Sequence, residues 1–238
     1  MTLFGFRPAL WPTVLTVPAL LVLLALGTWQ MQRLAWKTNL IQGMESRISA
    51  PAVDLPVGAL DVGEWEYRRV RVSGRFLHDK EFHLLAVSRN GQHGYQIVTP
   101  LRRATDVVLV NRGWVPRERK EAATRPAGQV AGDVTIAGVV RKPWGQGLFV
   151  PDNDSARNLW FFGDAAAMRR AAAISGPDLF VEAVAEPVPG GLPVGGQTRL
   201  DIPNRHLQYA LMWYGFAVAL AAIYVLWHRR ERRDGDKT

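Results

Sequence analysis

The side chains best suited to chemistry in this chain are its five histidines, because cysteine is absent. Thiol catalysis, thiolate metal ligands and disulfide bonds are thereby excluded. His78 and His83 lie five residues apart, so a single strand spanning both would place them on opposite faces and disfavour a shared metal. His93 falls in a predicted turn, and His228 follows an apolar run as an interfacial residue. His206 stands at the entrance of that run, where an ionisable side chain is a functional candidate.

Motifs that mark enzymes are absent from the sequence. It contains no G-x-S-x-G, no H-E-x-x-H, no phosphate loop and no G-x-G-x-x-G. We therefore expect a protein that is not an enzyme and has no catalytic residues. The alternative is an outward-facing, membrane-anchored hydrolase, whose signature would be a nucleophile and a base brought together by folding.

Two uncharged runs of 19 residues stand out, at 11–29 and 209–227. A helix needs about 20 apolar residues to cross a bilayer core, so both runs predict membrane spans. The first run could also be a secretory signal, but aromatic and basic residues follow it at once, which favours an uncleaved anchor. The expected segments are a cytoplasmic N-terminus at 1–10, spans at 11–31 and 209–227, an extracytoplasmic domain at 32–208 and a basic cytoplasmic tail at 228–238.

Basic residues near the second run set the expected orientation. Only Arg199 and Arg205 lie close before it, whereas its tail carries Arg229, Arg230, Arg232, Arg233 and Lys237. The positive-inside rule places this tail in the cytoplasm, although the first run taken alone leans weakly the other way. Two spans put both termini on one side. The net charge of +8 owes much to the tail, so it indicates contact with membrane lipid and not a nucleic-acid partner.

Alternating apolar and polar residues predict a β-rich domain between the spans. In residues 67–76 one face is basic or polar, and the other carries Val70, Val72, Gly74 and Phe76. Further strands are predicted at 81–88, 95–101, 106–116, 133–140 and 178–186. A turn is predicted at Asn90-Gly91, a helix at 164–174 capped by Asp164, and loops at 117–132 and 186–197. The fold class is α+β: two transmembrane helices flanking an antiparallel sheet or partial barrel with one helix.

Residues 111–116, with the sequence NRGWVP, form the densest motif of this domain. Gly113 indicates an unusual backbone or close packing, and Trp114 indicates a large buried anchor. Arg112 either orients a loop or contacts a partner. We favour the structural role for the motif.

His206 begins a stripe of residues spaced three and four apart, with Tyr209, Ala210, Trp213 and Ala217. The two small residues would admit a flat ring that the two aromatic residues flank. An interfacial aromatic belt combined with ordinary helix packing explains the same stripe in another way.

The first span supplies the expected opposite wall. Under the topology above, its outer end is at the depth of His206. Gly27 lies there and permits close approach of the two helices. Gln30 lies there too, as a polar group that needs a partner near the membrane core.

Several segments in one order resemble a known family. They are GTWQMQRLAWKTNLI at 27–41, EYRRVRVSGRF at 66–76, GYQIVTPL at 94–101, VLVNRGWVP at 108–116, NLWFFGD at 158–164 and NRHLQYALMWYGFA at 204–217. Together they resemble the Surfeit locus protein 1 family, the assembly factors of cytochrome c oxidase. The resemblance runs from the first span to the second, and the family architecture of two spans around a β-rich domain matches the one predicted above.

The resemblance implies partners and a cofactor that the residues alone do not name. It implies contact with the cytochrome c oxidase core subunit and other oxidase assembly factors. We expect the membrane to be a bacterial inner membrane, because the sequence begins without a transit peptide rich in serine and arginine; a mitochondrial origin is the alternative. The resemblance also implies transient binding of haem A, with His206 as the ligand of the haem iron. A departure lies beside it, because Arg205 stands where the family often has asparagine. The alternative is a cofactor-free scaffold that holds an oxidase subunit.

Overall fold

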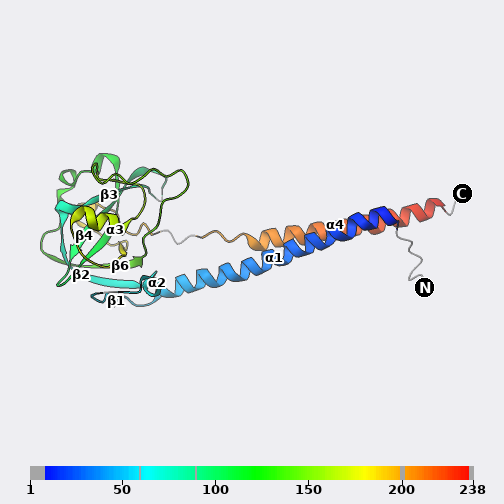
Figure 1. The fold of residues 1–238 in the computed structure, drawn as a ribbon, viewed down its shortest axis with the longest axis horizontal. Coiled ribbons are helices and arrows are strands. Elements are labelled where there is room, and N and C mark those ends of the chain that lie inside the picture. Colours follow the sequence, from blue (N-terminus) through cyan, green and yellow to red (C-terminus); the bar gives the residue numbers. More distant parts are fainter. Residues whose placement is uncertain (1–8, 59, 89, 199–201, 236–238) are drawn as a thin grey trace. The chain divides into compact units, whose positions relative to one another are not determined.

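The computed structural model of the chain describes residues 9–58, 60–88, 90–198 and 202–235, and the side chains among these up to residue 230 (Figure 1). It divides into two compact units. The helical unit comprises residues 1–43 and 201–238, and the barrel unit comprises residues 44–200. Most of the expected N-terminal segment and most of the expected basic tail therefore lie outside the described side chains.

Both apolar runs form helices, as predicted. Helix α1 spans Leu10–Ser49 and helix α4 spans His206–Gly235. Both are long and apolar enough to cross a membrane, with mean hydropathies of 2.0 and 1.8 over their most apolar windows. Helix α1 continues well past residue 31, the expected end of the span, because no proline occurs between residue 31 and Pro51.

The two helices of the helical unit run antiparallel and side by side (Figure 1). Hydrogen bonds join the start of α1 to the end of α4, from the Ala9 N–H to His228 Nε2 at 3.1 Å, and Thr13 to Tyr224 at 2.6 Å. Between them, Ala210 and Ala217 of α4 are 0% and 5% exposed. Residues this small let two helix backbones approach closely.

The centre of the barrel unit is a closed barrel of five strands. These are β2 (Arg69–Phe76), β6 (Asp133–Arg141), β8 (Phe180–Ala183), β5 (Val107–Pro116) and β4 (His93–Arg102), in that spatial order. Pairing of β2 with β4 at Phe76 and Leu101 closes the ring. Each of these strands was predicted, and closure decides the fold between a sheet and a barrel.

Three further strands extend the barrel at its edges. Strand β3 (Phe82–Val87) pairs antiparallel with β4, β7 (Leu159–Trp160) pairs parallel with β3, and β1 (Val53–Asp54) pairs parallel with β2. The pairing of β5 with β8 is also parallel. The sheet is thus mixed, where the sequence predicted an antiparallel one.

Short helices connect the strands. They are α2 (Val62–Trp65), α3 (Ala165–Ala172) and the 3₁₀ turns η2 (His78–Lys80), η3 (Arg117–Arg119), η4 (Ala122–Thr124), η5 (Pro126–Gly128) and η6 (Pro189–Gly191). Asp164 caps α3 as predicted, accepting a hydrogen bond from the Ala167 N–H at 2.8 Å. The helix ends two residues earlier than predicted, because Ala173 takes a left-handed conformation with φ of 50°.

The first four residues of strand β5, Val107–Val110, are all apolar because both faces of the strand are covered there. Val108 and Val110 point into the barrel, where they meet residues of all the other barrel strands. Leu109, between them, points outward and packs in a second core with Trp160 and Met168 beneath α3. A strand covered on both sides loses the alternation that marks a half-exposed strand.

Leu101 tests the barrel closure, because it is fully buried where β4 meets β2. We expect Leu101→Ala to lower the free energy of unfolding of the full chain by about 2–5 kcal/mol, since it leaves a cavity in the closed core. Thermal unfolding in detergent, followed by circular dichroism, measures this. Leu85→Ala is the control, because Leu85 is 39% exposed on β3 and should change stability by about 0.5 kcal/mol or less. Equal losses from both variants would contradict the closed barrel.

Candidate functional site

His206 and Gln30 meet in the helical unit. The Nδ1 atom of His206 lies 2.7 Å from Oε1 of Gln30. A carbonyl oxygen only accepts, so Nδ1 carries the proton and donates. In a neutral imidazole this leaves Nε2 with a free lone pair, and the described residues give Nε2 no hydrogen bond. The arrangement is the one by which proteins orient a metal-binding histidine through its other nitrogen.

The residues just before α4 are tied to α1 by two more hydrogen bonds. Lys37 Nζ donates to the Pro203 carbonyl at 2.6 Å, and Asn204 Nδ2 donates to Thr38 Oγ1 at 3.3 Å. These bonds fix where α4 starts relative to α1, and so fix the position of His206 beside Gln30. Arg205, in contrast, is exposed.

Gly27 and Gln30 are the two buried residues of α1. The ring of Tyr214 lies against Gly27, so closely that a Cβ there would fall 2.6 Å from ring carbon Cε1. The sequence predicted close helix approach at Gly27, and this contact confirms it. Sequence reasoning missed Tyr214 in the helical unit, because this residue lies one position outside the predicted stripe.

The predicted stripe on α4 divides between two environments. Tyr209 is 45% exposed, and Trp213 is half-buried in an edge contact with Phe216 at 6.0 Å. Ala210 and Ala217 are buried in the helix pair. They therefore do not form the open slot for a flat ring that the sequence suggested, because α1 packs on them. Only the exposed aromatic side of the stripe is free to meet a ligand.

Two of the histidines in the barrel unit, His78 and His83, have structural partners. His78 Nε2 lies 2.9 Å from the Val130 carbonyl, and His83 Nε2 lies 3.0 Å from a carboxylate oxygen of Glu81. His93 is exposed at the start of β4. His78 and His83 do not share a strand. Among the described residues, no three histidine or acidic side chains come together to hold a metal ion.

Arg112 of the NRGWVP motif is buried and holds the 117–132 loop. Its Nη2 donates to the Gly128 carbonyl, and its guanidinium lies 4.7 Å from the ring centre of Phe76. Burial lowers the pKa of Arg112 to about 10, against the attraction of Glu81 and together with the repulsion of Arg125. The side chain thus orients a loop, the first of the two roles considered from the sequence.

Gly113 and Trp114 fix a second segment to the barrel. Trp114 is 8% exposed and exchanges two backbone hydrogen bonds with Val194, at 2.9 and 2.8 Å. Gly113 has φ of 125°, and a Cβ there would collide with the Val194 carbonyl. Both the unusual backbone and the buried anchor were predicted, and the structure adds the segment that they hold.

A buried ion pair joins the 117–132 loop to the start of β3. Arg125 Nη2 donates to Glu81 Oε1, the same oxygen that His83 contacts, and both side chains of the pair are at most 5% exposed. Burial alone would raise the pKa of Glu81, but hydrogen bonds from His83 and Arg125, with the charge of Arg125, outweigh burial and lower it. Sequence reasoning missed this pair, because its partners lie 44 residues apart in segments rich in charge.

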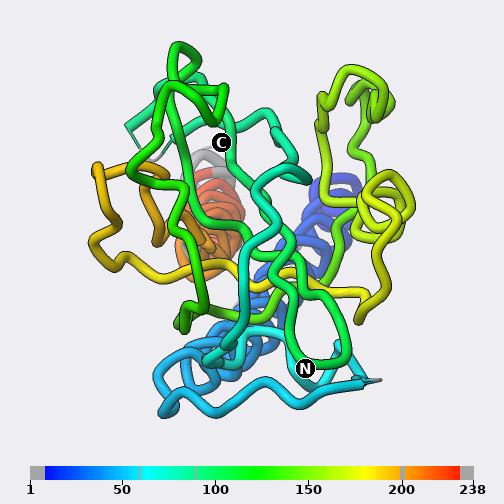
Figure 2. The backbone as a smooth tube through the Cα atoms, turned by 90° about the vertical axis from the view of Figure 1, so that its left-hand side faces the viewer, coloured from blue at the N-terminus to red at the C-terminus, as the bar shows by residue number. Residues whose placement is uncertain are grey.

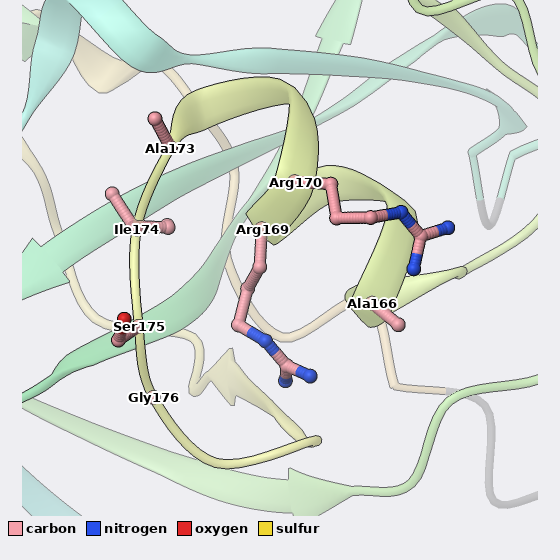
Figure 3. A pocket seen from close by; sticks show the side chains of 7 residues that line it. All are labelled: Ala166, Arg169, Arg170, Ala173, Ile174, Ser175 and Gly176. Carbon is pink, nitrogen blue, oxygen red and sulfur yellow. The ribbon is translucent and has the colours of Figure 1, made fainter.

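A surface hollow lies beside the C-terminal end of α3 (Figure 3). Its polar side chains include two arginines, of which Arg169 is tied to the Pro177 carbonyl at 2.7 Å and to Asp178 at 3.1 Å. None of the predicted site residues lines it. The hollow therefore offers no support for a catalytic or cofactor site in the barrel unit.

The fold, together with the hydrogen bond between His206 and Gln30, defines a class of protein in which two candidate membrane helices flank a five-stranded β-barrel. The model of the SURF1 family matches residues 17–218. Surfeit locus protein 1 of Xenopus tropicalis is 40% identical over 219 residues, 84% of this chain and 70% of that protein. The human Surfeit locus protein 1 is 40% identical over 86% of this chain and 72% of its own length. A SURF1-like protein of Drosophila melanogaster is 38% identical over 91% and 76%.

The chain belongs to the SURF1 family. The family match runs from within α1 to within α4 and includes the whole barrel, so it confirms the resemblance found in the sequence segments.

The Glu81–Arg125 pair predicts an acid-sensitive loop attachment. A carboxylate whose pKa is lowered by folding contributes stability above its ordinary pKa of 4.5, and this stability is lost as the pH falls through the lower folded value. Glu81→Gln should therefore lower the free energy of unfolding by about 3–5 kcal/mol at pH 7, because Arg125 loses its buried charged partner. On acidification the variant should lose less additional stability than the wild type. Unfolding in denaturant between neutral pH and pH values below 4.5 measures both effects.

Asp133→Asn is the matched control for this prediction. Asp133 pairs with Arg75 at 3.4 Å on the surface, and its side chain is 79% exposed. An exposed pair contributes about 0–1 kcal/mol. A Glu81→Gln protein that matched the control at pH 7 would show that the buried pair does not hold the loop.

Proposed function

We propose that this protein is an assembly factor of haem-copper cytochrome c oxidase. Membership of the SURF1 family carries the proposal, and the family is known for oxidase assembly. The architecture supports it, because two apolar helices hold a barrel with no recognised catalytic motif. The proposed partners are the oxidase core subunit and other oxidase assembly factors.

The proposed location is the inner membrane of a bacterium. Helices α1 and α4 span the bilayer, the termini lie in the cytoplasm and the barrel unit lies in the periplasm. The apolar length of both helices, and the lysine and arginine residues that follow the apolar run at 209–227, support this orientation.

We further propose that the protein binds haem A at His206 and presents it to the core subunit. The residues present fit the cofactor. Nε2 of His206 has a free lone pair, and imidazole nitrogen is a common axial ligand of haem iron. When bound, haem A supplies an iron centre that is the redox group of the oxidase core.

Each residue of the site has a stated part in this proposal. His206 binds through Nε2, and Gln30 keeps the proton on Nδ1 and holds the ring in place. Gly27 lets α4 come close enough for that hydrogen bond to form. Tyr209 and Trp213 offer aromatic surface beside His206 on the side of α4 that α1 leaves uncovered.

A cofactor-free scaffold is the second candidate function. The packing of Ala210 and Ala217 against α1 favours it, because it closes the slot expected between the helices. In this case the barrel unit alone holds an oxidase subunit, and His206 and Gln30 serve only to join the two helices.

Deletion of the gene tests the assembly role. We expect membranes of the deletion strain to lose most cytochrome c oxidase activity and most of the haem a absorbance of the assembled oxidase, while a b-type oxidase keeps its activity. The wild-type gene should restore both signals. Full oxidase activity and a full haem a spectrum in the deletion strain would overturn the assembly role.

A visible spectrum of the purified protein tests the haem site. From cells that make haem A, we expect the wild-type protein to carry the cofactor and His206→Ala to lose it. Gln30→Ala should bind more weakly and shift the absorbance maximum, because loss of an outer hydrogen bond typically costs about 10–100-fold in metal affinity. His93→Ala, at an exposed histidine of the barrel unit, should retain wild-type haem.

The same measurement separates the two candidate functions. Haem that persists undiminished in His206→Ala would exclude this residue as ligand. A haem-free wild-type protein, purified from cells with a working haem A pathway, would favour the scaffold.

A further inference from the structure

The loop between β6 and β7, residues 142–158, carries two fully exposed apolar side chains at its tip. Leu148 is 91% exposed and Phe149 is 102% exposed. Figure 2 shows the loop, coloured lime, standing away from the barrel strands. Single exposed apolar residues are ordinary on protein surfaces, but adjacent ones at a projecting tip form a wedge that neither packs on the barrel nor avoids water.

Hydrogen bonds within the loop hold this tip in shape. The Val150 N–H donates to the Gly147 carbonyl at 3.2 Å and closes a turn around the two residues. Gln146 Nε2 donates to the Val150 carbonyl at 2.6 Å and to Asp152 at 3.1 Å. Asn153 Oδ1 accepts from two backbone N–H groups of the segment that follows the loop, at 2.8 and 3.3 Å. Leu148 and Phe149 are therefore held at the surface by a hydrogen-bonded turn.

The conformation of Phe149 is itself unfavourable. Its φ is 62°, in the left-handed region where a residue with a Cβ is strained by roughly 1–2 kcal/mol. Bulky residues persist in this region where the surrounding structure imposes it, and such positions concentrate at functional sites. The side chain of Phe149 is fully exposed, so side-chain packing within the described chain does not offset this strain.

The size of the wedge indicates what it contacts. Burying two such side chains releases roughly 3–6 kcal/mol in total. A separate protein complex must overcome roughly 4–15 kcal/mol of lost freedom and usually buries at least about 1,200 Å². Two residues on a narrow turn do not reach either value. They suffice only where the surface that they contact is already held nearby. The membrane meets this condition for a domain whose two ends are both attached to membrane helices.

We propose that the Leu148–Phe149 turn inserts into the surface of the lipid bilayer, as a third attachment of the barrel unit beside α1 and α4. Apolar side chains at this depth lie at the boundary of headgroups and acyl chains. The loop carries no net charge, because Asp152 and Asp154 are matched in number by Lys142 and Arg157, and Asp154 pairs with Arg157 at 3.4 Å. The proposal rests on the membrane placement proposed above, and it assigns the loop a role independent of haem.

Site-directed fluorescence tests the insertion. Because the chain contains no cysteine, an introduced cysteine is the only thiol that the label can modify. Single-cysteine variants of the full chain, Phe149→Cys and Leu148→Cys, carry a nitrobenzoxadiazole label and are reconstituted in vesicles of phosphatidylethanolamine and phosphatidylglycerol. We expect blue-shifted emission, loss of most fluorescence to doxyl-labelled lipid and little quenching by iodide. Ala123→Cys, an exposed position in η4, is the control and should show the reverse.

A label in α4 distinguishes failure of this proposal from failure of the membrane placement. Val218 is 70% exposed in the apolar part of α4, so Val218→Cys should be quenched by doxyl lipid. Quenching there, together with iodide-accessible labels at both tip positions, would overturn the insertion alone. No lipid quenching at Val218 would overturn both. Tip labels protected from iodide only when the oxidase core subunit is added would assign the wedge to a protein partner and also overturn the insertion.

Discussion

Close approach of α1 and α4 is the constraint on which the candidate site depends. A hydrogen bond between side chains on two helices requires that the backbones be near enough for short side chains to meet. Gly27 provides this on α1, where the Tyr214 ring occupies the space of the missing side chain, and buried Ala210 and Ala217 provide it on α4. A larger residue at any of these positions would separate the helices, and the side chain of Gln30 would lose its hydrogen bond in an apolar environment.

In the barrel unit, the 117–132 loop is held by hydrogen bonds and an ion pair from largely buried side chains. Half of the residues in the 117–132 loop are charged or polar and most of the others are alanine or glycine, so the loop has little apolar surface to pack. It is attached instead by groups of the barrel. Arg112 holds its Gly128 carbonyl, His78 contacts its Val130 carbonyl, and Glu81 pairs with its Arg125. Removing one member of such a contact leaves its partner buried and without a hydrogen bond. Loss of one of these buried side chains should therefore lower stability more than loss of an exposed one.

The sequence predicts the elements better than it predicts their assembly. Two uncharged runs and clear alternation locate the helices and the barrel strands, because hydrophobic periodicity is local information. Strands β1 and β7 have two residues each, too few to show any periodicity. Closure of the barrel, the parallel pairing of β5 with β8 and the Glu81–Arg125 pair join residues far apart in the chain, and no local pattern records such contacts. At the candidate site, the helix end and close approach at Gly27 were predictable, but the closing of the stripe at Ala210 was not.

Two histidines of α4 show why His206 is the better candidate for a ligand. His228, six percent exposed, has both ring nitrogens engaged: Nδ1 donates to the Tyr224 carbonyl at 2.8 Å, and Nε2 accepts from the Ala9 N–H at 3.1 Å. That histidine gives the Ala9 N–H, just before α1, a hydrogen-bond partner. His206 is held in the same tautomer by Gln30, yet its Nε2 meets no donor among the described residues. The same residue type on one helix is therefore saturated at one end and keeps one lone pair available at the other, and an available lone pair on an oriented imidazole is what a metal centre requires.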